Sequence, residues 1–77
     1  MNIKFHKSAV KFLKRQSVIQ QERLIMAINI LPNGDVKPLQ GKTSNFRLRV
    51  GNYRVIFNLE DDSIYVLEIG NRGDIYK

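Results

Sequence analysis

Large apolar side chains alternate with polar ones between residues 46 and 57, in the sequence FRLRVGNYRVIF. A period of two predicts β-strands with one buried face, and the central Gly51-Asn52 pair predicts a two-residue hairpin turn. In that register Arg49 lies opposite Arg54, and Arg47 lies opposite Ile56. The pattern therefore predicts a β-hairpin with three guanidinium groups on one face. Like charges directly opposite each other destabilise a strand pair by roughly 0.2–1 kcal/mol, so this arrangement requires an explanation.

The rest of the chain divides into shorter periodic segments and turn-rich connections. Residues 35–45 (DVKPLQGKTSN) are expected to form a surface connection without regular structure. The elements expected before and after it are a strand Asn2–Phe5, a helix from an N-cap at Ser8 to Gln16, a second helix from an N-cap at Ser17 to Leu31, and the strands Phe46–Val50, Tyr53–Leu59 and Ser63–Ile69.

This order predicts a single α+β domain over residues 1–77: an N-terminal strand, a two-helix hairpin and a three-stranded antiparallel meander. The helices are expected to cover one face of the sheet. The stripe of the second helix that faces the core is expected to contain Val18, Ile25, Ile28 and Leu31.

That layering leaves Arg47, Arg49 and Arg54 on the uncovered face. They could simply be the solvated side of a half-covered antiparallel sheet. A binding surface for an anionic ligand is the alternative, because the hairpin carries no acidic residue and a guanidinium fork matches phosphate oxygens. Tyr53 and Tyr65 are expected to pack on the sheet.

Composition narrows the function classes. The chain has 77 residues and a net charge of +6, which favours an anionic partner such as nucleic acid or an acidic protein. It has no cysteine and one histidine, His6, so disulfides and a dedicated zinc site are not expected. No apolar run approaches the length of a membrane span and the N-terminus lacks the pattern of a signal peptide, so a cytoplasmic protein is expected.

Four segments together resemble the RelE/ParE superfamily of toxins from toxin–antitoxin systems, specifically its RelE-like branch. They are IKFHKSAVKFLKRQ, DVKPLQG, FRLRVGNYRVIF and VLEIGNRGDIYK, and they span nearly the whole chain. The combination of RLRVGNYRV with a distal GNRxxxY is more specific than either piece alone.

The resemblance implies a ribosome-dependent endoribonuclease that cleaves messenger RNA in the ribosomal A site and inhibits translation. In this family a ribose 2′-oxygen attacks the adjacent phosphodiester, without a metal or other cofactor. The resemblance assigns phosphate binding to Arg47 and Arg49, contact with the scissile phosphate to Arg54, and stabilisation of developing charge to Arg72. Tyr76 would stack on a base or assist proton transfer. A cognate acidic antitoxin is the expected protein partner.

The general base is the least defined role. Relatives often carry histidine at the position of Asn71, so Asn71 and Glu68 are additional candidates, although Glu68 could instead be an ion-pair partner of Arg54. His6 is expected to be a surface residue at the strand–helix junction. Two other functions stay open: a ParE-like inhibitor of DNA gyrase with the same fold and no nuclease activity, and a small non-catalytic RNA-binding or antitoxin-like module.

Overall fold

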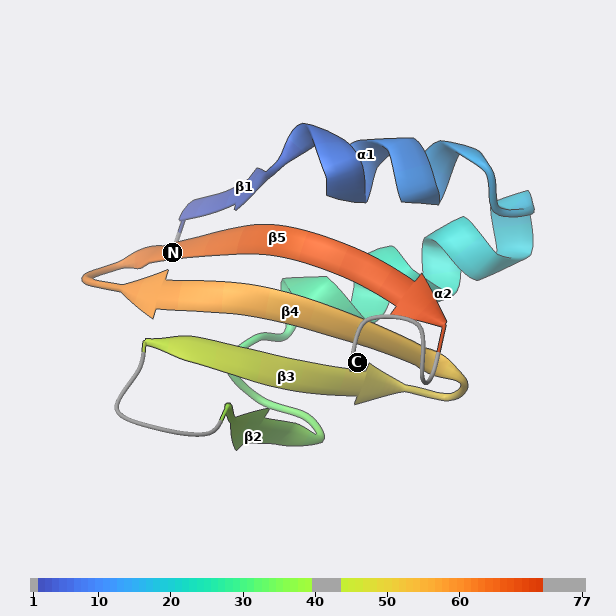
Figure 1. Cartoon of the computed structure of the whole chain (residues 1–77). Coiled ribbons are helices and arrows are strands. Elements are labelled where there is room, and N and C mark those ends of the chain that lie inside the picture. The colour runs from blue at the N-terminus through green and yellow to red at the C-terminus, as the bar shows by residue number, and fades with distance from the viewer. Residues whose placement is uncertain (1, 40–43, 72–77) are drawn as a thin grey trace.

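Two helices and a five-stranded mixed sheet make up the computed structural model, which describes residues 2–39 and 44–71 (Figure 1). The predicted α+β class is confirmed. The elements are β1 Asn2–Phe5, α1 Lys7–Lys14, α2 Val18–Asn29, β2 Val36–Pro38, β3 Asn45–Val50, β4 Tyr53–Glu60 and β5 Ser63–Asn71.

The strand order is β1-β5-β4-β3-β2 (Figure 1). The predicted antiparallel meander forms its centre, with β1 added in parallel beside β5 and β2 added antiparallel beside β3. The expectation that residues 35–45 hold no regular structure was wrong, because Val36 pairs with Leu48 and Pro38 with Phe46. Proline lacks a backbone N–H and is tolerated in a short edge strand such as β2. Because the strand is short and contains proline, the sequence shows no clear strand pattern there.

The hairpin between β3 and β4 has the register that the alternation predicts. Val50 pairs with Tyr53 and Arg49 pairs with Arg54 across the turn. Gly51 has a φ of +58°, a left-handed conformation that suits glycine at the first central position of a hairpin turn. The turn chemistry and the hydrophobic pattern thus specify the same register.

Helix α1 begins two residues earlier than expected, because His6 and not Ser8 is its N-cap. The ring Nδ1 of His6 accepts a hydrogen bond from the backbone N–H of Ser8 at 3.2 Å. The hydroxyl of Ser8 instead donates to the carbonyl of Leu67 at 2.9 Å and joins the start of α1 to β5. Ser17 is the N-cap of α2, as predicted, and accepts from the N–H of Gln20.

The core brings together side chains from both helices and the central strands. Its largest fully buried side chains are Phe57, Leu24, Ile28, Leu48, Ile64, Val55 and Val66. Figure 1 shows α2 behind the strands and α1 beside β5. The predicted stripe on α2 was wrong at Val18, which is 69% exposed, and it omitted Leu24, which is fully buried.

Strand β5 contains a β-bulge at Leu67. Ile56 pairs with Glu68, whereas the next residue of β4, Phe57, pairs with Val66. The apolar spacing explains the extra residue: Ile64, Val66 and Ile69 are all buried, and a regular strand would turn the third of these away from the other two.

Candidate nucleic-acid interface

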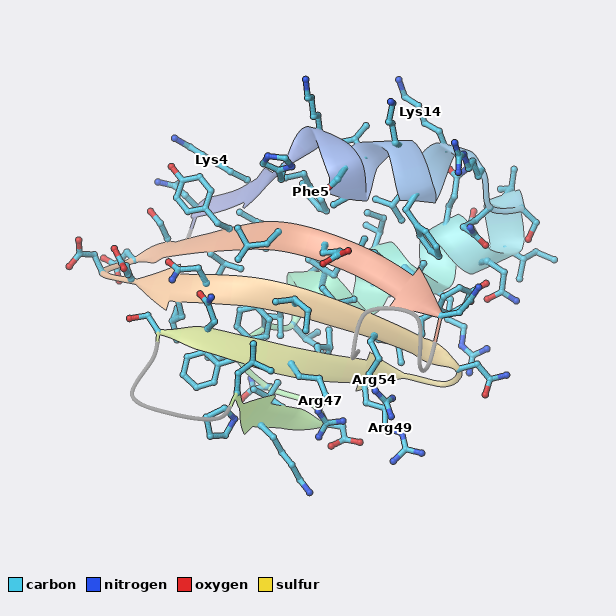
Figure 2. All side chains as sticks on the ribbon, in the orientation of Figure 1. Lys4, Phe5, Lys14, Arg47, Arg49 and Arg54 are labelled. Carbon is cyan, nitrogen blue, oxygen red and sulfur yellow. The ribbon has the colours of Figure 1, made fainter. Side chains whose placement is uncertain are left out.

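Four basic residues share one face of the sheet. Lys37, Arg47 and Ile56 lie in one row across β2, β3 and β4, and Arg49 lies opposite Arg54 in the next row. We call the face that carries Lys37, Arg47, Arg49 and Arg54 the arginine face. Figure 2 shows its three arginines close together toward the turn between β3 and β4.

The three arginines differ in exposure. Arg49 is exposed and Arg47 is half-buried, but Arg54 is only 7% exposed. The sequence predicted that Arg54 projects into solvent; it lies on the predicted face but is buried. Arg54 belongs to β4, which lies between β5 and β3 in the sheet. Residues of the neighbouring strands can therefore restrain its guanidinium group.

Gly70 is the partner of Arg54 on β5. Gly70 is itself buried and adds no side chain beside the guanidinium of Arg54, and glycine positions in strands often allow another backbone or a ligand to approach closely. The combination of a restrained Arg54, an exposed Arg49 and a neighbouring glycine is suited to a compact anion such as a phosphodiester.

Lys37 is a basic residue of this face that sequence reasoning missed. It is exposed and pairs with Arg47, which brings a lysine from β2 beside the arginines of the hairpin. The sequence signal for β2 was the segment Val36–Pro38. Three residues are too few to distinguish a strand from a loop.

The bulge at Leu67 places Glu68 on the arginine face. Glu68 is exposed and lies across from Ile56, in the row of Arg47, and not across from Arg54. Its role as a general base or as an ion-pair partner of Arg54 stays a prediction. Asn71 is exposed and pairs with Tyr53, so its register position belongs to the opposite, core-facing side.

Two of the predicted catalytic residues, Arg72 and Tyr76, lie outside the described residues. His6 is exposed at the junction of β1 and α1, as expected. Within residues 2–39 and 44–71 no group of three or more His, Cys, Asp or Glu side chains could hold a metal ion. None of the helices described is long and apolar enough to cross a membrane.

Comparisons with known proteins agree on the family. Residues 3–76 match the family model of the ParE toxin of type II toxin–antitoxin systems. The chain is 30% identical over 84 residues to Toxin RelE3 of Methanocaldococcus jannaschii, an alignment that covers 99% of this chain and 96% of the relative.

Solved structures give the same result. The archaeal RelE–RelB complex from Pyrococcus horikoshii OT3 contains a chain that is 31% identical, with a TM-score of 0.77 and coverage of 95% of this chain and 96% of that chain. The RelB–RelE antitoxin–toxin complex from Methanococcus jannaschii gives 28% identity, a TM-score of 0.78 and coverage of 95% and 94%. The chain therefore belongs to the RelE/ParE superfamily, as a RelE-like toxin of a type II toxin–antitoxin pair.

Proposed function

We propose that this toxin is an endoribonuclease that cleaves messenger RNA in the ribosomal A site and so inhibits translation. The observation that carries the proposal is the direct pairing of Arg49 with Arg54, with Arg47 in the adjacent row. Like charges on directly opposed residues disfavour a strand pair, whereas an anion bound beside them is attracted by both. A phosphodiester is such an anion, and guanidinium groups bind its oxygens through paired hydrogen bonds.

The reaction proposed is transesterification within the RNA strand. A ribose 2′-oxygen loses its proton to a base and forms a bond to the adjacent phosphorus, while the bond from phosphorus to the 5′-oxygen breaks. The products are a 2′,3′-cyclic phosphate and a 5′-hydroxyl, whose oxygen takes up a proton. Negative charge increases on the phosphoryl oxygens as the reaction proceeds. In this proposal Arg54 and Arg49, which are paired across the hairpin, neutralise that charge.

The remaining roles follow the family pattern. Arg47 and Lys37 hold the RNA backbone next to the reacting phosphate. Arg72 stabilises the leaving group or the phosphorane, and Tyr76 stacks on a base or moves a proton. Glu68 lies across from Ile56, in the row of Arg47, and is the candidate base that can be tested by substitution.

A cognate acidic antitoxin is the proposed protein partner. Relatives of this chain are found in complexes with RelB-type antitoxins. A protein of net charge +6 with a basic sheet face attracts a partner that carries complementary carboxylates. Coverage of the arginine face by that partner would exclude RNA.

The decisive experiment is single-turnover cleavage of a message on programmed ribosomes. Arg54→Ala and Arg72→Ala are each expected to lower the rate by about 10²–10³-fold, the usual effect of removing one preorganised donor to a developing oxyanion. Tyr76→Phe should retain most activity if the ring only stacks, and should behave like Tyr76→Ala if the hydroxyl moves a proton. Wild-type rates in all of these variants would overturn the nuclease assignment.

Inhibition of DNA gyrase is the alternative function, and the ParE description of the matching family model favours keeping it. A gyrase inhibitor does not need guanidinium groups paired across a hairpin. A supercoiling assay should be run beside the cleavage assay with the same preparations. Loss of supercoiling with no RNA cleavage would establish the alternative.

A further inference from the structure

A second polar row crosses the arginine face beside the row of Arg47. Asn58 follows Ile56 by two residues on β4, so the two rows are about 7 Å apart. The register places four residues in line across β3, β4, β5 and β1: Asn45, Asn58, Tyr65 and Lys4. We call these four residues the tyrosine row.

Contacts organise the tyrosine row. The side-chain Nδ2 of Asn58 donates to Oδ1 of Asn45 at 2.8 Å, and Nζ of Lys4 lies 5.8 Å from the centroid of the Tyr65 ring. That distance is within the range of a cation–π contact. A ring, an ammonium group and side-chain amides thus lie side by side on the face that carries the arginines.

The exposure of Tyr65 is not explained by packing. Its side chain is 43% exposed, whereas Tyr53, on the core side of the sheet, is half-buried and meets the ring of Phe12 edge to face. The expectation that Tyr65 packs on the sheet accounts for part of the ring only. An exposed aromatic ring on a basic sheet face is a feature that surfaces binding single-stranded nucleic acid share.

Acidic residues limit how far a nucleic acid can extend past Tyr65. Glu60 lies one row further along β4, and Asp61 and Asp62 follow in the turn to β5; all three are exposed. These carboxylates repel a phosphate, so the RNA backbone has to remain on the arginine side or near Lys4. A nucleobase, which carries no charge, can still stack on the ring.

We propose that Tyr65 is a stacking subsite for a single nucleobase of the RNA, one or two rows away from the phosphate held by the arginines. Lys4 neutralises the phosphate of the same nucleotide, and the amides of Asn45 and Asn58 meet the base edge. This subsite rests on the proposed function, because its ligand is the same RNA. Stacking of a base does not require that the RNA is cleaved. It extends the interface from the hairpin to β5 and β1, strands that the sequence motif of the arginines does not include.

A tryptophan probe tests the subsite directly, because the chain contains no tryptophan. Tyr65→Trp places a single indole at the proposed platform, and a stacked base is expected to quench its fluorescence. The ligand is a short single-stranded RNA with 2′-O-methyl groups, which cannot undergo the proposed transesterification. Ile19→Trp is the matched control, since Ile19 on α2 is also well exposed, at 74%.

The expected result is saturable quenching in Tyr65→Trp and none in Ile19→Trp. Equal quenching in the two variants, or none in either, overturns the subsite. Because no cleavage occurs in this experiment, its result is separate from the nuclease assignment: quenching in a protein that cleaves no message would support the subsite and reject the nuclease.

Affinity measurements add a second readout. Tyr65→Ala is expected to weaken binding of the same RNA by about 5-fold or more, whereas Tyr65→Phe, which keeps the ring, should bind nearly as well as the natural chain. Met26→Ala removes an exposed side chain of α2, and should leave the affinity unchanged. Equal affinities for Tyr65→Ala and the natural chain would reject stacking at this position.

Discussion

At the residue scale, the pairing of Arg49 with Arg54 is unfavourable for the sheet, and under the proposed function it favours an anionic ligand. The two residues lie directly opposite each other, and one is exposed while the other is buried. A sheet that only needed a solvated face would be more stable with threonine or a carboxylate at one of these positions. The arrangement thus resembles functional sites in which stability is lower than the fold permits.

Arg49→Thr tests whether this residue lowers the stability of the sheet while it supports activity. The substitution removes the like-charge pair and introduces a residue favoured in strands, so the free energy of unfolding should stay constant or rise by roughly 0.2–1 kcal/mol. Cleavage of ribosome-bound message should fall. Urea denaturation and single-turnover cleavage measure the two effects, with Arg49→Lys as the variant that keeps the charge. A loss of more than about 1 kcal/mol would show that Arg49 has a structural partner.

At the element scale, helix α2 contacts the turn that sets the arginine register. A Cβ added to Gly51 would lie 2.9 Å from Nη2 of Arg23, so the guanidinium of Arg23 lies against the glycine. The turn conformation holds Arg49 and Arg54 opposite each other. The position of α2 and the geometry of the candidate site are therefore linked through one glycine.

Gly51→Ala should destabilise the protein by about 1–2 kcal/mol, because a left-handed φ is unfavourable for alanine and the new Cβ meets Arg23. Arg23→Ala in the same chain should relieve only the steric part, since the backbone strain remains. Thermal unfolding of the two single variants and the double variant measures this coupling. Gly51→Asn serves as control, because asparagine tolerates the left-handed region better. Purely additive effects would rule out a contact between Arg23 and the turn.

A second link joins the helices to the start of β4. The hydroxyl of Tyr53 donates to Oε1 of Gln16 at 3.0 Å, and Nε2 of Gln16 donates to the carbonyl of Phe12 at 3.2 Å. Gln16 lies in the short segment between α1 and α2. The bond therefore fixes the helix junction against the strand that carries Arg54.

Tyr53→Phe should lower the free energy of unfolding by about 0.5–1.5 kcal/mol, because the partly buried Gln16 loses its donor while the ring contact with Phe12 is kept. Tyr65→Phe is the matched control and should be close to neutral, since its ring is well exposed. Chemical denaturation of both variants provides the comparison. Equal stability of the two would mean that the bond to Gln16 contributes nothing measurable.

The sequence predicted those parts of the fold that depend on local patterns. The hairpin register followed from alternation and the glycine of the turn, and Ser17 was identified as a cap. The pairing of β1 with β5 was missed because it joins residues about sixty positions apart, as in Ile3 with Ile64. For the site, the arginine face was predicted, but Lys37 and the tyrosine row depend on strands β2 and β1, whose partners the pattern does not specify.

The bulge in β5 follows from the spacing of its buried residues. Ile64, Val66 and Ile69 are separated by two and then three positions, which a regular strand cannot bury on one face. That spacing predicts an extra residue between Val66 and Ile69. It also decides that Tyr65 and Glu68 share the arginine face, a result that a regular alternation does not give.

At the scale of the whole molecule, charge is distributed unevenly. Arg47, Arg49 and Arg54 gather near the turn between β3 and β4, while Glu60, Asp61 and Asp62 occupy the turn between β4 and β5 at the other end of these strands. Helix α1 adds the exposed residues Lys7, Lys11 and Lys14 and has no acidic residue. The sheet and α1 are thus two separate groups among the thirteen basic residues, and a ligand held by the sheet should respond to the charge of the sheet and not to that of α1.

Arg47→Gln and Lys11→Gln separate local charge from net charge, because each removes one positive charge from the same total of +6. Binding to single-stranded RNA releases counterions, and the slope of log K against log salt changes by about 0.7 for each phosphate that the protein no longer neutralises. Arg47→Gln should reduce the magnitude of the slope by about that amount and weaken binding at low salt. Lys11→Gln, on α1, should leave the slope unchanged, because charges further away than about 10 Å are screened at 0.1 M salt. Fluorescence titrations at four or five salt concentrations would measure both slopes. Equal changes in the two variants would mean that RNA responds to the net charge of the protein and that the arginine face holds no defined phosphate site.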